Sequence, residues 1–220
     1  MSQATTALSN LFNATPNLTA AYYYNLETGQ TVSKNTATLI TSASTYKLFI
    51  ALFVIHQIET GKLSWNSAYP YSSGTVRSGF YDMIHISDNT FPQWIIAKYG
   101  KATIDTYLKS QGYKGIFNNS DHAMTSANDL GNILKYYNSH SSDSNVSYLL
   151  SLMKNQVYRS GIPAGTGQVV ADKVGFLWDV RNDAGIVYDK HPYILVLMTN
   201  NQTNFDLICR ISKQVQTIVG

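Results

Sequence analysis

Apolar and polar residues alternate with different periods in successive parts of the chain. Residues 3–13 have the spacing of a short amphipathic helix. The stretch LTAAYYYNLETGQTVSKN predicts two strands joined by a turn at Glu27–Gln30. From Thr45 the period becomes helical, and this apolar helix is expected to end near Gly61, because glycine can cap a helix C-terminus.

The middle of the chain, residues 62–157, reads as helices joined by connectors rich in serine, asparagine and glycine. Four segments each have the length and period of one helix: NTFPQWIIAKYG, KATIDTYLKSQG, TSANDLGNILKYYN and VSYLLSLMKNQV. Pro92, near the start of the first segment, suits an early helical turn, where its missing N–H costs nothing.

From Gly165 onward the strand period returns. GQVVADKVGFLW, AGIVYD and PYILVLMTN predict three strands, and NFDLICRISKQVQTIV predicts a closing helix. Since strands lie at both chain ends, we expect an α/β (α+β) fold with one antiparallel sheet of about five strands, flanked by the terminal helices. The 220 residues fit a single domain: a sheet lobe of residues 1–44 and 158–220, and an inserted all-helical lobe of residues 45–157.

Composition narrows the range of partners. The net charge is only +3 and the lysines are scattered, so nucleic acid is not an expected partner. No apolar run reaches the roughly 20 residues that a membrane span needs. The single cysteine, Cys209, excludes an internal disulfide and has the helical spacing of a buried core thiol. No pair of histidines has ligand spacing, so we expect neither a metal nor an organic cofactor.

The sequence constrains the cellular location less than it constrains the partners and cofactors. The N-terminal stretch MSQATTALSNLF lacks the basic and apolar regions of a signal peptide. Low charge with abundant serine, threonine and asparagine is typical of secreted or cell-wall proteins. We expect a monomeric secreted or cell-envelope protein whose export signal has been removed; the alternative is a cytoplasmic protein.

The stretch TSASTYKLFIALFVI holds the first candidate for chemistry. Residues i and i+3 lie on one face of a helix, so Ser44 and Lys47 can touch. Serine needs a nearby base, and a lysine among apolar side chains has a lowered pKa, so its neutral amine can take the serine proton. The alternative is helix capping by Thr41, Ser42 and Ser44. The motif alone is weak, because it recurs at Ser151–Lys154 inside a predicted helix.

The second candidate is Ser87-Asp88-Asn89. It is either a loop in which Asp88 or Asn89 caps the next helix, or a functional loop facing a cleft. In the functional interpretation Ser87 carries a proton and Asn89 is an amide hydrogen-bonding group. His85, two residues earlier, is interpreted as a helix-face residue rather than a second base.

The third candidate is Lys173-Val174-Gly175, in the first strand after the helical block. Such a strand can border a cleft between lobes, where glycine permits close approach of a ligand to the backbone. The pattern is weak by itself, because Lys98-Tyr99-Gly100 also matches it.

In this order the three motifs resemble those of the penicillin-recognising serine hydrolases, and of the class A β-lactamases most of all. The resemblance covers nearly the whole chain. YYYNLETGQTVSKN resembles the family's first hairpin, STYKLFIALFVIHQIETGKLS its central helix, and SGIPAGTGQVVADKVG and NDAGIVYDKHPYILVLMTNN its closing strands. It implies an acyl-enzyme mechanism on β-lactams or related amide and peptide substrates.

Carried over by position, the resemblance implies catalytic residues Ser44, Lys47, Ser87 and Lys173 and substrate-binding residues Asn89, Val174, Gly175 and Phe176. Ser44 would attack a carbonyl and become acylated, with Lys47 as base or base relay. Ser87 would pass a proton to the leaving nitrogen, and Asn89 would hold the substrate's side-chain amide. Lys173 would supply positive potential for a substrate carboxylate. The backbone N–H groups of Ser44 and Phe176 would form the oxyanion hole.

The sequence departs from the family pattern at the step that releases the product. Class A β-lactamases use a glutamate on a long loop to activate the deacylating water. The only glutamates here are Glu27 and Glu59, and the corresponding segment is short. Asp121 and His122 are its only titratable substitutes, and exposed loop polar groups are the preferred interpretation of both. We therefore expect slow β-lactam deacylation.

The sequence also departs where the family binds a substrate carboxylate. Val174 stands where the family usually has threonine or serine, and Ala184 where class A enzymes often carry an arginine. Arg181 is the nearby substitute. These changes weaken recognition of a free carboxylate.

Three functions compete. The first is a β-lactamase-like serine hydrolase acting on a small-molecule β-lactam or a related amide or peptide. The second is a D-Ala-D-Ala carboxypeptidase-like penicillin-binding enzyme, acting on peptidoglycan peptide. The third, from another class, is a catalytically retired ligand-binding module. The five-residue set Ser44, Lys47, Ser87, Asn89 and Lys173 argues against the third, because a retired site has no chemical reason to keep both lysines.

Overall fold

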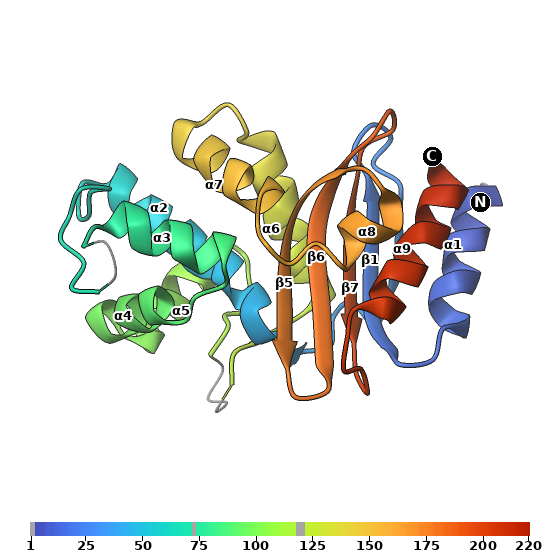
Figure 1. The fold of residues 1–220 in the computed structure, drawn as a ribbon, viewed down its shortest axis with the longest axis horizontal. Helices are drawn as coiled ribbons and strands as arrows, with labels where there is room; N and C mark the ends of the chain where they lie inside the picture. The colour runs from blue at the N-terminus through green and yellow to red at the C-terminus, as the bar shows by residue number, and fades with distance from the viewer. Residues whose placement is uncertain (1–2, 72–73, 118–121) are drawn as a thin grey trace.

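The computed structural model describes residues 3–71, 74–117 and 122–220. A five-stranded antiparallel sheet in the order β2-β1-β7-β6-β5 forms the centre of the molecule (Figure 1). Its strands are β1 (Leu18–Asn25), β2 (Thr31–Lys34), β5 (Val169–Leu177), β6 (Val180–Tyr188) and β7 (Tyr193–Thr199). The N-terminal hairpin pairs with the C-terminal strands, which confirms the predicted sheet. Strand β5 is an edge strand.

The terminal helices cover one face of this sheet. Helices α1 (Gln3–Ala14) and α9 (Asp206–Val219) lie side by side there, with the short α8 (Ile162–Thr166) beside them (Figure 1). Their apolar side chains form one buried cluster with those of the sheet, among them Leu8, Phe12, Leu195, Ile208 and Ile211. Cys209 is half-buried, so the predicted core position of this thiol is wrong. It lies between the buried positions 208 and 211 and turns away from the core stripe.

The remaining long helices lie on the other side of the sheet (Figure 1). They are α2 (Lys47–Glu59), α3 (Val76–His85), α4 (Thr90–Tyr99), α5 (Lys101–Ser110), α6 (Ala127–Ser139) and α7 (Ser144–Lys154). Helix α2 is apolar on all sides and therefore buried on all sides. Helix α6 packs on the sheet itself, where Gly131 leaves room for the ring of Tyr22.

Helices α4, α5, α6 and α7 confirm the four predicted from their periods, whereas α3 and α8 were not predicted. Strand β3 (Ile40–Thr41) pairs with β4 (Met124–Thr125) and leads into a 3-10 turn, η1 (Ala43–Tyr46), before α2. Helix α2 gives way to a turn at Gly61, whose φ of 72° favours glycine. No described helix is both long and apolar enough to cross a membrane.

The predicted capping of α2 by hydroxyl side chains is wrong. Ser42 Oγ donates to the backbone oxygen of Ala123, and Thr45 Oγ1 donates to that of Ser42. Thr41 Oγ1 is directed at the sulfur of Met124. No side chain caps either η1 or α2. The hydroxyls of this stretch instead fasten η1 to its surroundings, which leaves the hydroxyl of Ser44 for other partners.

Candidate active site

The turn η1 lies directly against the edge strand β5. A Cβ atom at position 175 would lie 2.7 Å from the oxygen of Ser42 and 2.9 Å from the amide nitrogen of Ser44, so only glycine fits there. From β6, Asn182 Nδ2 donates to the backbone oxygens of Thr41, at 2.9 Å, and Ser42, at 3.1 Å. These contacts fix Ser44 beside the edge strand.

Lys47 lies one turn after Ser44, and its Nζ is 3.0 Å from Ser44 Oγ. The side chain is 0% exposed. Nζ also lies 2.6 Å from the backbone oxygen of Ser87 and 2.7 Å from Asn89 Oδ1, both of which can only accept a hydrogen bond. A neutral amine can give its two N–H groups to these oxygens, which leaves its lone pair for the proton of Ser44.

Burial lowers the pKa of Lys47 to about 7, although the negative charge of Asp88 acts in the opposite direction. An ordinary lysine has a pKa of about 10.4 and is almost entirely protonated at neutral pH. Near pH 7 the amine of Lys47 is therefore available as a base in a large fraction of molecules.

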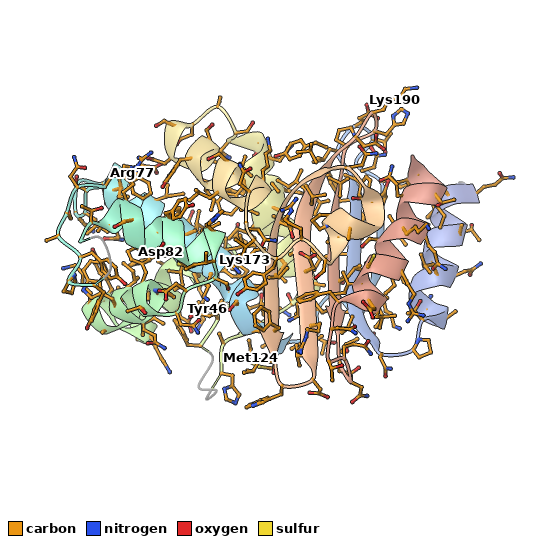
Figure 2. All side chains as sticks on the ribbon, in the orientation of Figure 1. Tyr46, Arg77, Asp82, Met124, Lys173 and Lys190 are labelled. Carbon is orange, nitrogen blue, oxygen red and sulfur yellow. The ribbon has the colours of Figure 1, made fainter. Side chains whose placement is uncertain are left out.

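Ser87 lies in the turn between α3 and α4, with its side chain between the two buried lysines. Its Oγ is 2.8 Å from Lys173 Nζ and 3.2 Å from Lys47 Nζ. Ser87 has a φ of 59°, a left-handed conformation that non-glycine residues seldom adopt. Figure 2 shows Lys173 at the junction between β5 and the helices. The strained turn thus presents the Ser87 hydroxyl and carbonyl to both amines.

Lys173 is 1% exposed, and its Nζ also donates to the backbone oxygen of Val174. Burial and, next, the positive charge of Lys47 hold the pKa of Lys173 well below its ordinary value. The acidic side chains Asp172 and Asp183 act in the opposite direction. Two ammonium groups around one serine hydroxyl repel each other, which favours a state with a single proton on the pair.

The capping interpretation of Ser87-Asp88-Asn89 is confirmed for Asp88. The carboxylate of Asp88 accepts from the backbone N–H groups of Thr90, at 2.7 Å, and Phe91, at 3.2 Å, and so caps α4. Asn89 makes no capping bond and accepts from Lys47.

A pocket of about 320 Å³ opens next to Ser44. It is lined by Thr41, Ala43, Ser44, Tyr46, Asn89, Gln93, His122, Ala123, Phe176 and Leu177. Val174 and Gly175 do not line it: the side chain of Val174 is buried, and Gly175 lies under η1. Sequence reasoning missed Gln93, although it lies one helical turn after Asn89 on the same face of α4.

Comparison with known proteins gives the family. A model of the β-lactamase enzyme family matches residues 3–218. The chain belongs to this family. It is therefore a serine hydrolase, and the resemblance stated from the three motifs is confirmed. No curated protein sequence matches the chain.

Solved structures of PBP-A and of β-lactamases have the same fold. PBP-A superposes with a TM-score of 0.87 at 24% identity, covering 99% of this chain and 96% of its own. A β-lactamase from Sphaerobacter thermophilus gives 0.81 at 16% identity, covering 98% and 95%. An ancestral class A β-lactamase gives 0.80 at 16% identity, covering 97% and 98%. At these identities the likeness concerns the fold.

Of the described residues considered as substitutes for the β-lactamase glutamate and arginine, only His122 lines the pocket. Glu27, in the turn between β1 and β2, pairs with His191, in the turn between β6 and β7, and Glu59 ends α2. His122 lines the pocket with its ring against Trp178, and Asp121 lies outside the described residues. Ala184 is buried in the sheet, and Arg181, which pairs with Phe176 across β5 and β6, does not line the pocket.

The remaining motif matches lie away from the pocket. Ser151 is exposed and donates to the backbone oxygen of Tyr148 in its own helix. Lys98 lies in the last turn of α4, with its amine against the ring of Trp94. His85 stacks on Tyr81, its neighbour one turn earlier on α3, which agrees with its interpretation as a helix-face residue.

A buried pair of acids lies behind Lys173, on the opposite face of the sheet. Asp172 forms an ion pair with Arg159 at 2.5 Å and accepts from Gln156. Asp183 accepts from the N–H of Ile162 at 2.8 Å, and the two buried carboxyl groups each affect the pKa of the other. Burial raises the pKa of Asp183 to about 6 and that of Asp172 well above its ordinary value. Sequence reasoning gave no signal for this pair.

No group of three or more histidine, cysteine, aspartate or glutamate side chains among residues 3–71, 74–117 and 122–220 is placed to hold a metal ion.

Proposed function

We propose that the protein cleaves amide bonds of β-lactams or related peptides through an acyl-enzyme at Ser44, and that it releases a β-lactam acyl group slowly. The observation that carries this proposal is the position of Lys47, a fully buried amine with a pKa of about 7 in contact with Ser44 Oγ. The proposal rests on the family for the reaction class and on these residues for the individual steps.

In the first step, Ser44 Oγ forms a bond to the substrate carbonyl carbon while Lys47 takes the hydroxyl proton. The π electrons of the carbonyl move onto its oxygen. The N–H groups of Ser44 and Phe176 are our candidates for holding that oxyanion, because Ser44 N lies against Gly175, the residue before Phe176.

In the second step, the carbonyl re-forms and the bond to the leaving nitrogen breaks. Ser87 Oγ gives its proton to that nitrogen and receives the proton of Lys47, which is 3.2 Å away. Lys173 holds Ser87 in position at 2.8 Å. Lys47 is neutral again, and every proton is accounted for. Asn89, on the pocket wall, is our candidate for binding the substrate's amide.

Release of the acyl group requires an activated water, and neither glutamate lies at the pocket. A leucine-to-glutamate mutant of PBP-A has been solved as an acyl-enzyme complex with penicillin G, which supports acylation by a penicillin on this fold. The lack of a glutamate at the pocket also favours the second candidate, a D-Ala-D-Ala carboxypeptidase-like penicillin-binding enzyme of the cell wall. For either substrate class we propose a secreted or cell-envelope protein.

The test is incubation with a penicillin, followed by intact-mass spectrometry over time. Opening of the β-lactam ring loses no atoms, so acylation adds the mass of the whole penicillin. We expect this adduct on the wild type and on Ser151→Ala, no adduct on Ser44→Ala, and decay over minutes or longer. No adduct, or an equal adduct on Ser44→Ala, would refute acylation and favour a retired binding module. Rapid steady-state turnover would refute slow release.

A further inference from the structure

We propose that the end of strand β5 forms a subsite for an uncharged aromatic or apolar group, so that the preferred substrates carry no free carboxylate on the leaving side of the scissile bond. This inference rests on the proposed acyl-enzyme function and names the substrate class within it: neutral amides are favoured, and the D-Ala-D-Ala termini of the second candidate, which end in a free carboxylate, are disfavoured. It is carried by the positions of the cationic residues and of two exposed aromatic side chains.

No cation lines the pocket. All 16 lysines and arginines of the sequence lie among the described residues, and none is part of the pocket wall. Lys47 and Lys173 lie beneath it, each fully buried and each already directed at serine and backbone oxygens. A carboxylate entering the pocket would lose water without gaining a salt bridge.

Arg181 is the nearest substitute for a carboxylate-binding arginine, but its guanidinium is already engaged. Nη1 donates to the backbone oxygens of Trp178, at 2.8 Å, and Val180, at 2.7 Å. Nη2 donates to the backbone oxygen of Thr203 at 2.8 Å. Arg181 therefore fastens the β5–β6 turn to the chain before α9, and this structural role takes up three of its five N–H donors.

Phe176 also covers Arg181. The two residues form a cross-strand pair, and the guanidinium carbon lies 5.9 Å from the centre of the Phe176 ring. The ring packs further against Tyr158 and Phe205, at centroid distances of 5.2 and 6.3 Å. An aromatic side chain thus lies over the cation, on the strand that borders the pocket.

The lip of the pocket is aromatic and open to solvent. Phe176 is 40% exposed, and Trp178, two residues further, is 67% exposed. The ring of Trp178 meets that of His122, another residue of the pocket wall, edge to face at 4.8 Å. Exposed aromatic side chains beside a pocket provide contact area for an apolar or aromatic group and no charge for an anion. The same site therefore favours a neutral group and disfavours a carboxylate.

The test compares benzylpenicillin with its methyl ester, which differ only in the carboxylate. The second-order rate constant for adduct formation on Ser44 is measured by intact mass for each compound. We expect the ester to acylate at least about tenfold faster, since a carboxylate that loses part of its water without gaining a charged partner costs more than about 1.4 kcal/mol.

Phe176→Ser should uncover Arg181 and shift the ratio of the two rate constants toward the acid by about tenfold. The double variant Phe176→Ser, Arg181→Met should lose that shift. Tyr81→Ser is the matched control, because Tyr81 is also 40% exposed but lies on α3 and is not part of the pocket wall. Thermal unfolding of each variant shows whether it is folded.

The outcomes separate the two proposals. Equal or faster acylation by the acid in the wild type overturns the uncharged subsite and leaves the acyl-enzyme function standing. No adduct with either compound, in a protein that is folded, counts against the acyl-enzyme function itself. An unchanged ratio in folded Phe176→Ser overturns the assigned role of that residue.

Discussion

The two Ser-x-x-Lys sequences of this chain have the same spacing and opposite surroundings. Ser44 and Lys47 lie at the start of α2, where the amine is fully buried and 3.0 Å from the hydroxyl. Ser151 and Lys154 lie on the surface of α7, where the hydroxyl bonds its own helix and the amine lies over the ring of Tyr188 at 4.1 Å. The spacing brings a serine and a lysine within reach, but burial and polar partners from other elements make the amine a base.

The strongest test of this comparison removes each lysine in turn. Lys47→Ala should lower the rate of Ser44 acylation by a penicillin about 10³-fold, because a positioned base typically contributes 10²–10⁴-fold. Lys154→Ala should leave the rate unchanged within about twofold. Both rates are read as adduct formation by intact mass. A Lys47→Ala protein that is folded and acylates within about tenfold of the wild type would contradict the role of Lys47 as base.

The pH dependence of acylation tests whether Lys47 acts as a neutral amine. Its pKa of about 7 predicts a rate that falls tenfold per pH unit well below that value, or about fiftyfold between pH 7 and pH 5. A lysine with an ordinary pKa would give a rate that still rises above pH 9. The rate constant is measured from pH 5 to 10, and a profile that is flat below pH 7 would contradict the prediction.

Asp88→Asn provides a control for this profile. The charge of Asp88 raises the pKa of Lys47, so its removal should move the midpoint to lower pH. Asparagine is also a good helix cap, so α4 should keep its N-terminal hydrogen bonds.

Much of this fold can be predicted from the period of its apolar residues. The apolar stretches of the main sheet strands and of the four helices α4 to α7 were enough to predict these elements, whereas α8 is five residues long and too short to show a pattern. The stretch GFYDMIH in α3 mixes polar, aromatic and glycine residues, so the helix was not predicted, although Thr75 and Ser78 form a capping box there.

The site is only partly predictable, because its decisive contacts join distant segments. The motifs named Ser44, Ser87 and Lys173, but the 2.8 Å contact of Ser87 with Lys173 spans 86 residues. The position of Arg181 in the sequence makes it a substitute for a carboxylate-binding arginine, but the sequence does not show that three backbone carbonyls bind its guanidinium. Asn182, which holds η1, has no sequence signal of its own.

Gly175 tests how the first serine is held in place. In Gly175→Ala the added Cβ would meet backbone atoms of Ser42 and Ser44 closer than 3.0 Å, so η1 must move away from β5. We expect a loss of about 2 kcal/mol in the free energy of unfolding and a slower acylation of Ser44. Both are measured, by denaturant unfolding and by adduct formation. A variant as stable and as fast as the wild type would show that the strand does not position the serine.

The smallest expected effect concerns Asp172 and Asp183, the buried acids behind Lys173. Among the described residues, no such acids lie behind the exposed Ser151–Lys154 pair on α7. Because burial raises the pKa of Asp183 to about 6, the folded state binds more protons than the unfolded state between about pH 4 and pH 6. The wild type therefore loses stability as pH rises through this range. Asp183→Asn keeps an acceptor for Ile162 N–H and adds a donor for Asp172.

This variant should therefore gain about 1 kcal/mol relative to the wild type between pH 5 and pH 8. Urea unfolding at both pH values measures the difference. Asp183→Ala is the control, because it leaves a buried N–H without a partner and should be destabilised at both pH values. If Asp183→Asn and the wild type have parallel pH profiles, Asp183 does not titrate between pH 5 and pH 8 in the folded state.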